Sequence, residues 1–148
     1  MWVLFLILGI VALDQITKFW AASVLTSKTL VVISGLFDFR YAENNGAAWS
    51  ILQGYRWVLL AVSALMLALL IWNRSEFMKN RVWGRLALAL LVGGILGNAI
   101  DRLCYGYVID FIQVYIGSYP FPTFNVADSA ICIGVVAYGI MMATGRKR

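Results

Sequence analysis

Four aspartates lie within or beside long apolar segments of the chain: Asp14, Asp101, Asp110 and Asp128. The sequence has only seven acidic residues, so more than half of them occupy such positions. A charged aspartate at the centre of a bilayer costs about 3 kcal/mol, and carboxylates at that depth therefore face a cavity or a partner. Histidine is absent, which excludes Ser-His-Asp nucleophiles and His-ligated metal sites. Any chemistry must use carboxylates, amides, hydroxyls, lysine or arginine.

Asp110 and Asp128 are the pair that best fits a catalytic role. Asp110 has apolar neighbours on both sides and no cation within seven residues. The apolar segments that flank the pair are consecutive, so they are expected to be antiparallel neighbours, and the two carboxylates can then meet at one membrane face. Two carboxylates in one site do not both ionise easily, so one keeps a proton while the other acts as a base toward water. This pattern predicts aspartic hydrolase chemistry.

The other two aspartates have structural interpretations. Asp14 precedes Lys18 by four residues, a spacing that allows an intrahelical ion pair. Asp101 is followed by Arg102 and preceded by Asn98 one turn earlier. We therefore expect this cluster to bring its own counter-charge and amide and to position a polar group.

Two alternatives involve the start of the last apolar segment. Asn125 and Asp128 have the spacing of a helix N-cap and its third residue, so Asp128 can serve as a capping carboxylate. A Ser-Lys hydrolase built from Ser129 and Lys18 is also conceivable. The second alternative is the weaker one, because Asp14 already offers Lys18 a partner one turn away.

The elements that carry these residues are predicted to be membrane helices. Of the 148 residues, 62% are hydrophobic and 13% are charged, against about half and a quarter in soluble proteins. Apolar segments cover residues 2–25, 57–72, 86–103 and 126–143, each near the roughly 20 residues that cross a bilayer. We expect a membrane all-α fold with four transmembrane helices, in a single domain that covers residues 1–148.

The distribution of cations predicts that both termini are cytoplasmic. Seven cations lie on the predicted inner side: Arg74, Lys79, Arg81, Arg85, Arg146, Lys147 and Arg148. The opposite side holds Lys28, Arg40 and Arg56. Because the cations flank apolar segments, the net charge of +5 does not indicate a nucleic-acid partner. The first segment is expected to be a retained helix, since Asp14 and Lys18 interrupt it.

Two segments on the predicted outer side do not have a helical pattern. Within residues 29–50, aromatic residues alternate with polar ones, and Ser34-Gly35 and Asn45-Gly46 are turn signals, so we expect a small sheet there. The second segment contains Tyr115, Tyr119 and Phe121 beside two prolines. This composition predicts an aromatic loop at the membrane interface.

Five motifs together resemble the lipoprotein signal peptidase (signal peptidase II) family over essentially the whole chain. In order they are LDQITK at 13–18, ENNGAAWS at 43–50, GGILGNAIDR at 93–102, VIDF at 108–111 and FNVADS at 124–129. The resemblance implies four transmembrane helices, an extracytoplasmic β-cradle and a short interfacial helix or loop. Trp49 is a departure, because the family usually has phenylalanine at that position.

The activity that this resemblance implies is that of an intramembrane aspartic endopeptidase. Such an enzyme removes the signal peptide from diacylglyceryl-modified prolipoproteins by cleaving on the amino side of the lipidated cysteine, with activated water as the nucleophile. The implied partners are these substrates and membrane lipids, without nucleic acid, cofactor or metal. We expect a multi-pass monomer in the bacterial cytoplasmic (inner) membrane, with its active site near the extracytoplasmic face.

The resemblance also assigns roles to individual residues. It places the catalytic dyad on Asp110 and Asp128, in agreement with the choice made from the residues themselves. Substrate binding or positioning falls on Asn44, Gly46, Gly94, Asn98, Arg102 and Asn125. Supporting roles fall on Asp14, Lys18 and Asp101. For the glycines of the third segment, close helix packing is an equally good interpretation.

Two other classes of protein remain open from the sequence. A small transporter or channel subunit would use the membrane carboxylates as proton or cation sites, although no paired repeats are evident. A structural membrane subunit would use Asp14-Lys18 and Asp101-Arg102 as pins between helices. The second class leaves Asp110 unexplained.

Overall fold

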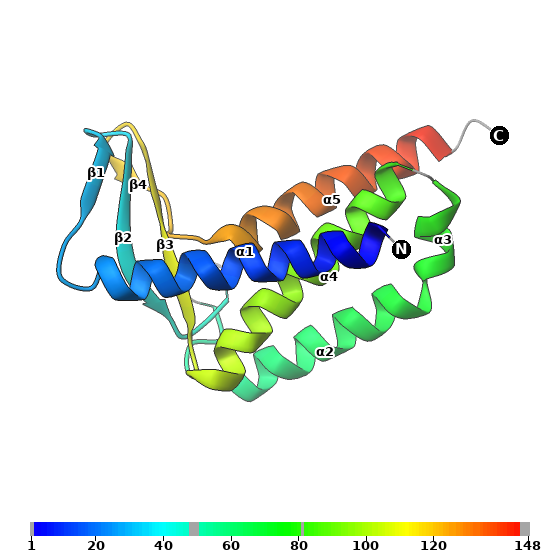
Figure 1. Ribbon diagram of the computed structural model, residues 1–148, viewed down its shortest axis with the longest axis horizontal. Coiled ribbons are helices and arrows are strands. Elements are labelled where there is room, and N and C mark those ends of the chain that lie inside the picture. The colour runs from blue at the N-terminus through cyan, green and yellow to red at the C-terminus, as the bar shows by residue number, and fades with distance from the viewer. Residues whose placement is uncertain (1, 48–50, 81, 146–148) are drawn as a thin grey trace.

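A computed structural model of the chain describes residues 2–47, 51–80 and 82–145, which form five helices and four short strands. The helices are α1 (Trp2–Val24), α2 (Arg56–Trp72), α3 (Arg74–Lys79), α4 (Trp83–Cys104) and α5 (Val126–Gly145). The strands are β1 (Leu30–Ile33), β2 (Phe37–Asn44), β3 (Val108–Ile116) and β4 (Tyr119–Pro120). The sheet lies at one end of the helices, and α3 lies at the other end (Figure 1).

All four predicted apolar segments are helical, close to their expected bounds. Three helical segments are long and apolar enough to cross a membrane: Trp2–Val24, Trp83–Cys104 and Val126–Ala143. The fourth, α2, is an apolar helix of 17 residues. The count of four membrane spans therefore stays a prediction.

The helices bury polar side chains and expose apolar ones. In α1, Asp14 and Lys18 are 0% and 1% exposed, whereas Phe19 is 76% exposed. Asp101 of α4 is also fully buried, while Trp72 at the end of α2 is 86% exposed. Fully buried charges together with many exposed large apolar side chains are unusual for a protein in water. This is the distribution expected of helices whose outer surface contacts lipid.

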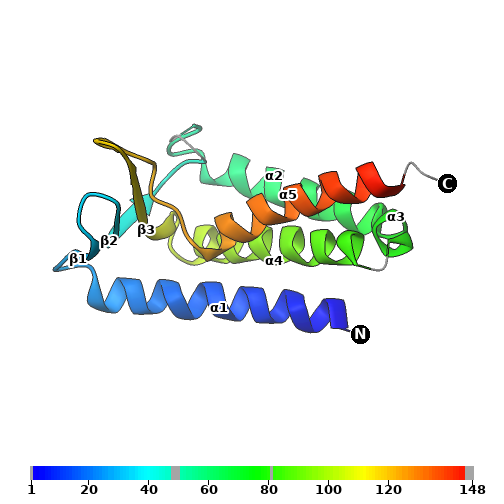
Figure 2. The ribbon, with the colours of Figure 1, turned by 90° about the horizontal axis from the view of Figure 1, so that it is seen from above.

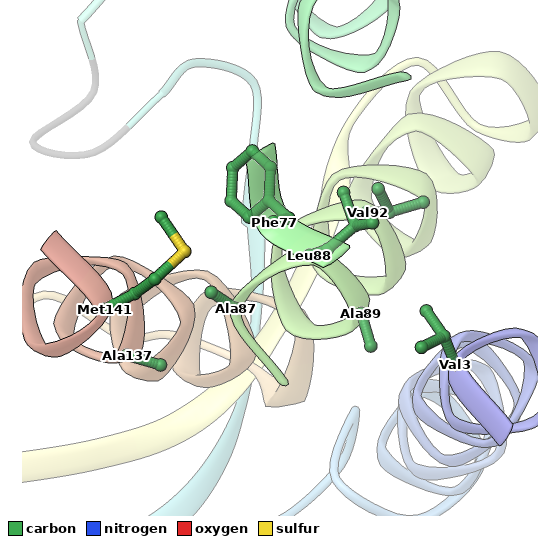
Figure 3. Close-up of a cluster of buried hydrophobic side chains, with 8 residues drawn as sticks. All are labelled: Val3, Phe77, Ala87, Leu88, Ala89, Val92, Ala137 and Met141. Atoms are coloured by element: carbon green, nitrogen blue, oxygen red, sulfur yellow. The ribbon is translucent and has the colours of Figure 1, made fainter. Parts of the chain in front are cut away.

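Two apolar clusters hold these elements together. At the end away from the sheet, a buried cluster joins α1, α3, α4 and α5 (Figure 3) through Val3, Phe77, Ala87, Leu88, Ala89, Val92, Ala137 and Met141. At the sheet end, Ala21 of α1 and Leu25, just after that helix, pack against Ile109 and Phe111 of β3. Helix α4 is the central element, since it packs against α1, α2, α3 and α5 (Figure 2).

The four strands form one antiparallel sheet in the order β1-β2-β3-β4. Strands β1 and β2 confirm the sheet predicted for the first outer segment, and Gly35 at φ 71° forms the turn between them. The rest of that segment, after β2, is described only to residue 47. Trp49, the departure from the family pattern, lies outside the described residues. The described residues between β2 and α2 form bends and turns.

Strands β3 and β4 correct the predicted aromatic loop. Tyr115 lies in β3 and pairs with Pro120 of β4, and Ile116 pairs with Tyr119. The run from Val108 to Ile116 is rich in β-branched and aromatic residues, which favour strands. Pairing with β2 on one side and β4 on the other stabilises the strand, because it satisfies backbone hydrogen-bonding groups of β3.

Among the described residues, cations predicted for the inner side and cations predicted for the outer side lie at opposite ends of the molecule. The N-terminal end of α1, the C-terminal end of α5 and all of α3 lie at the end away from the sheet (Figure 1). Arg74 and Lys79 belong to α3, whereas Arg40 belongs to β2. Arg81 and residues 146–148 lie outside the described residues. The side of the membrane on which each end lies stays a prediction.

Candidate active site

A cavity of about 820 Å³ lies where the sheet meets α4 and α5. Asp110 of β3 and Asp128 of α5 both line it, so the fold brings the predicted pair to one space. The cavity is further lined by Asn44 of β2 and by Asn98 and Arg102 of α4. The rest of its wall is largely apolar and includes segments 119–124 and 131–133.

Asp110 is held by two amide groups. Its side chain is 2% exposed, and β2 lies beside it, with Ala42 as the paired residue. Asn44 Nδ2 donates to Asp110 Oδ2 at 3.1 Å, and Asn125 Nδ2 donates to Oδ1 at 2.7 Å. Burial, and next the charge of Asp128, raise the pKa of Asp110 to about 7, against the lowering effect of the two amides. This carboxyl can therefore hold a proton near neutral pH.

Asp128 caps α5 and faces the cavity at the same time. Asp128 N donates to Asn125 Oδ1 at 2.9 Å, and Asn125 N donates to Asp128 Oδ2 at 3.2 Å. This reciprocal pair is the geometry of the predicted capping box. The other oxygen, Asp128 Oδ1, accepts from Asn98 Nδ2 at 2.7 Å. The capping interpretation and the functional one are therefore compatible.

The two asparagines connect the carboxylates to each other. Asn125 Nδ2 donates to Asn98 Oδ1 at 3.1 Å as well as to Asp110. Asn98 lines the cavity, whereas Asn125 is 0% exposed behind it. A continuous path of hydrogen bonds thus runs from Asp110 through Asn125 and Asn98 to Asp128. Two residues that the sequence suggested as substrate contacts hold the aspartates in place.

Behind this layer lies a buried group of charges, Asp14, Lys18 and Asp101, called here the charge triad. Lys18 Nζ lies 2.8 Å from Asp14 Oδ2 and 3.0 Å from Asp101 Oδ2. The predicted intrahelical pair of Asp14 and Lys18 is confirmed. Asp14 Oδ1 also accepts from the backbone N–H of Ala127 at 2.8 Å, which links α1 to the start of α5.

The partner of Asp101 differs from the prediction. Asp101 pairs with Lys18 of α1, and its Oδ2 accepts from the backbone N–H of Ile109 at 3.0 Å. Arg102 instead donates from Nη2 to the carbonyl oxygen of Gly46 at 2.9 Å. Consecutive residues on a helix point in different directions, so Asp101 faces the bundle while Arg102 faces the cavity. Asp101 therefore does not bring its own counter-charge.

Of the two predicted glycines, Gly94 allows close helix packing and Gly46 contributes a backbone hydrogen bond. A Cβ on Gly94 would lie 2.5 Å from the carbonyl oxygen of Ala127 and 2.7 Å from Ile131 Cγ1. Gly94 is not among the residues that line the cavity, which favours the helix-packing interpretation. Gly46 does not line it either, but its N–H donates to Asn44 Oδ1 at 2.9 Å. This contact turns the amide nitrogen of Asn44 toward Asp110.

Some residues at the site were not predicted from the sequence. Gln15 Nε2 donates to Asp101 Oδ1 at 2.9 Å and to the carbonyl oxygen of Gly97 at 3.2 Å. Helical spacing could have indicated this role, because Gln15 lies one turn before Lys18 on the same helix. Glu43 and the residues that follow β4 also line the cavity. Ser129 Oγ donates to the carbonyl oxygen of Asn125 at 3.0 Å, and no hydrogen bond found within the described residues joins it to Lys18.

Apolar helices, a small sheet at one end and a carboxylate-lined cavity between the sheet, α4 and α5 are the features of a membrane-embedded enzyme. Two solved structures of that class have this fold. One solved bacterial membrane enzyme superposes with a TM-score of 0.83 at 33% sequence identity, over 99% of this chain and 91% of the other. A second superposes with a TM-score of 0.82 at 34% identity, over 95% and 91% of the two chains.

The chain belongs to the signal peptidase II family, whose model matches residues 6–144. Curated relatives are named lipoprotein signal peptidase. The protein of Nostoc punctiforme is 42% identical over 84% of this chain and 78% of its own length. That of Xanthomonas euvesicatoria is 40% identical over 99% and 89%. That of Listeria welshimeri is 36% identical over 87% and 84%. The chain is therefore a membrane-embedded protease.

Proposed function

We propose that this chain is an intramembrane aspartic endopeptidase that removes the signal peptide from diacylglyceryl-modified prolipoproteins. The cut falls on the amino side of the lipidated cysteine. The observation that carries the aspartic mechanism is the placement of Asp110 and Asp128 on one cavity, joined by amide hydrogen bonds. Membership of the signal peptidase II family supports the substrate class.

In the proposed reaction the two aspartates have different roles. Asp128 lies in the first turn of α5, where the helix dipole favours negative charge, so it serves as the base. It takes a proton from water, and the water oxygen attacks the carbonyl carbon that precedes the lipidated cysteine. Asp110 gives its proton to the carbonyl oxygen. The carbon–nitrogen bond then breaks, the amine leaves with the proton held by Asp128, and Asp110 regains its own.

The remaining cavity residues would hold the substrate. An unpaired peptide group at membrane depth costs several kcal/mol, so an extended substrate needs hydrogen-bond partners there. Asn44, Asn98 and Arg102 offer polar groups along the cavity. Gly46 and Asn125 position them, and Gly94 lets α4 approach α5. The lipid chains of the substrate would stay in the bilayer, against the apolar wall at 131–133.

The proposed setting is the bacterial cytoplasmic (inner) membrane. We place four spans across it, with α2 as the fourth, both termini in the cytoplasm and the sheet with the active site at the outer face. The chain would act as a single domain and as a monomer, with no metal or cofactor.

Cleavage of a synthetic diacylglyceryl-modified prolipoprotein peptide by the detergent-purified protein tests this proposal. Asp110→Asn and Asp128→Asn should each lower kcat/KM by at least about a hundredfold, the size of a general acid–base contribution. Glu76→Gln is the matched control, because Glu76 is exposed on α3 at the other end of the molecule. A chelator should leave the rate unchanged. Full activity of either aspartate variant would contradict the assignment.

A further inference from the structure

Lys18 is the only lysine or arginine among the described residues whose side chain is fully buried. Its ammonium lies against Asp14 and Asp101, and its remaining donor goes to Asn98 Oδ1 at 2.9 Å. A buried ammonium costs several kcal/mol unless it is well paired, and the two carboxylates supply that pairing. The third hydrogen bond is made to a neutral amide of the cavity.

This third contact decides which way the Asn98 carboxamide faces. An ammonium group has only donors, so the amide oxygen must face Lys18. The same oxygen accepts from Asn125 Nδ2 at 3.1 Å. The NH2 group is then left for Asp128 Oδ1, 2.7 Å away. In the opposite orientation, NH2 would face two donors and the oxygen would face a carboxylate, and both contacts are repulsive.

We propose that Lys18 is a positioning residue for the aspartate pair, because it fixes the Asn98 carboxamide with its NH2 group toward Asp128. The role rests on the proposed function of the pair, and it goes beyond a helix-stabilising ion pair with Asp14. Because Asn125 also donates to Asp110 Oδ1 at 2.7 Å, the same hydrogen-bond path reaches both carboxylates.

The charge of Lys18 adds a second effect that can be measured. It lowers the pKa of Asp110, against the larger raising effects of burial and of Asp128. The other charged groups that line the cavity beside the pair are Arg102 of α4 and Glu43 of β2. Loss of Lys18 should therefore shift the pH–rate profile toward higher pH.

Lys18→Met tests the proposal, with Lys79→Met as the matched control. Lys79 has the same side chain but lies 70% exposed in α3 and pairs with Glu76. Lys18→Met should lower kcat/KM per folded molecule by about tenfold or more, as for other groups that orient site residues. Its alkaline limb should move up by as much as about one pH unit. A purely structural role would reduce only the folded fraction. An unchanged kcat/KM and pH profile would overturn the proposal.

Lys18→Met leaves Asp14 and Asp101 without a cation, so this variant can fail to fold. A second comparison tests the proposal in that case. Asp101→Asn alone is compared with Asp101→Asn combined with Lys18→Met, where only one buried carboxylate of the triad loses its partner. The combined variant should again show lower kcat/KM and a shifted alkaline limb. Equal values for the two would overturn the role of Lys18.

A readout without catalysis separates this proposal from the proposed function. The side-chain NH2 resonance of Asn98 in detergent micelles is identified by its loss in Asn98→Ala. It should move in Lys18→Met and stay in place in Lys79→Met. If the wild type cleaves no lipidated peptide, the proposed function fails while this resonance still decides the position of Asn98. An unmoved resonance would overturn the proposal.

Discussion

The aspartate pair is surrounded by neutral amides, while the nearby cations make their direct contacts elsewhere. Asp110 accepts from Asn44 and Asn125, and Asp128 accepts from Asn98. A lysine or arginine in direct contact would favour two ionised carboxylates and remove the proton that Asp110 keeps. Amides hold both side chains in place without forcing that charge state.

The pH dependence of cleavage follows from the environment of Asp110. Burial, and then the charge of Asp128, raise the pKa of this carboxyl to about 7. In the proposed mechanism Asp110 acts in its protonated form, so kcat/KM should fall as the pH rises through about 7. Rates measured with the lipidated peptide from about pH 5 to pH 9 check this expectation. A rate that stays flat to the alkaline end would show that no proton on the pair is required.

At the scale of elements, the site depends on close approach of α4 to its neighbours. A Cβ on Gly97 would lie 2.5 Å from Asp14 Oδ2, and one on Gly93 would lie 2.9 Å from Ile10 Cβ. Together with Gly94, these glycines let α4 approach both α1 and α5. Only at that distance can the charge triad and the amides Asn98 and Asn125 form their contacts.

Gly97→Ala should destabilise the protein by roughly 1–3 kcal/mol, the usual range for overpacking. The added methyl group would force α4 away from the Asp14 carboxylate. Gly139→Ala is the control, because nothing lies within 4 Å of a Cβ at that position of α5. It should be neutral, or stabilising by up to about 1 kcal/mol from helix propensity. Thermal unfolding in detergent compares the two, and equal Tm values would contradict the packing role.

At the scale of the whole molecule, buried polar groups lie toward the sheet, and apolar side chains cover much of the outer surface of the helices. Phe19 and Trp72 are largely exposed, whereas Asp14 and Lys18 are almost completely buried. The sheet lies at one end, and the cations of α3 lie at the other (Figure 1). Since cations are retained in the cytoplasm, this polarity supports an outward-facing sheet.

Cysteine labelling tests that orientation. In a background with Cys104→Ser and Cys132→Ser, Ser34→Cys places a thiol at the β1–β2 turn, and Ser75→Cys places one on α3. A membrane-impermeant maleimide applied to intact bacterial cells should label the first variant. The second should react only after the membrane is disrupted. The reverse pattern would contradict the proposed orientation.

The sequence by itself determined the four apolar helices, the pairing of Asp14 with Lys18, and Asp110 and Asp128 as candidates for a pair. These features depend on local composition, helical spacing or the missing histidine, all of which can be read along the chain. The capping geometry of Asn125 and Asp128 was predicted for the same reason, because its contacts span only three residues.

Only the tertiary structure decided which distant groups meet. Lys18, rather than the adjacent Arg102, pairs with Asp101 because helix packing brings α1 against α4. The end of strand β3 and strand β4 lie where an aromatic loop was expected, because the two strands pair with each other there. The orientation of Asn98 likewise depends on donors from α1 and from Asn125. Such contacts join residues far apart in the chain, so their geometry is fixed by packing and cannot be read from local sequence.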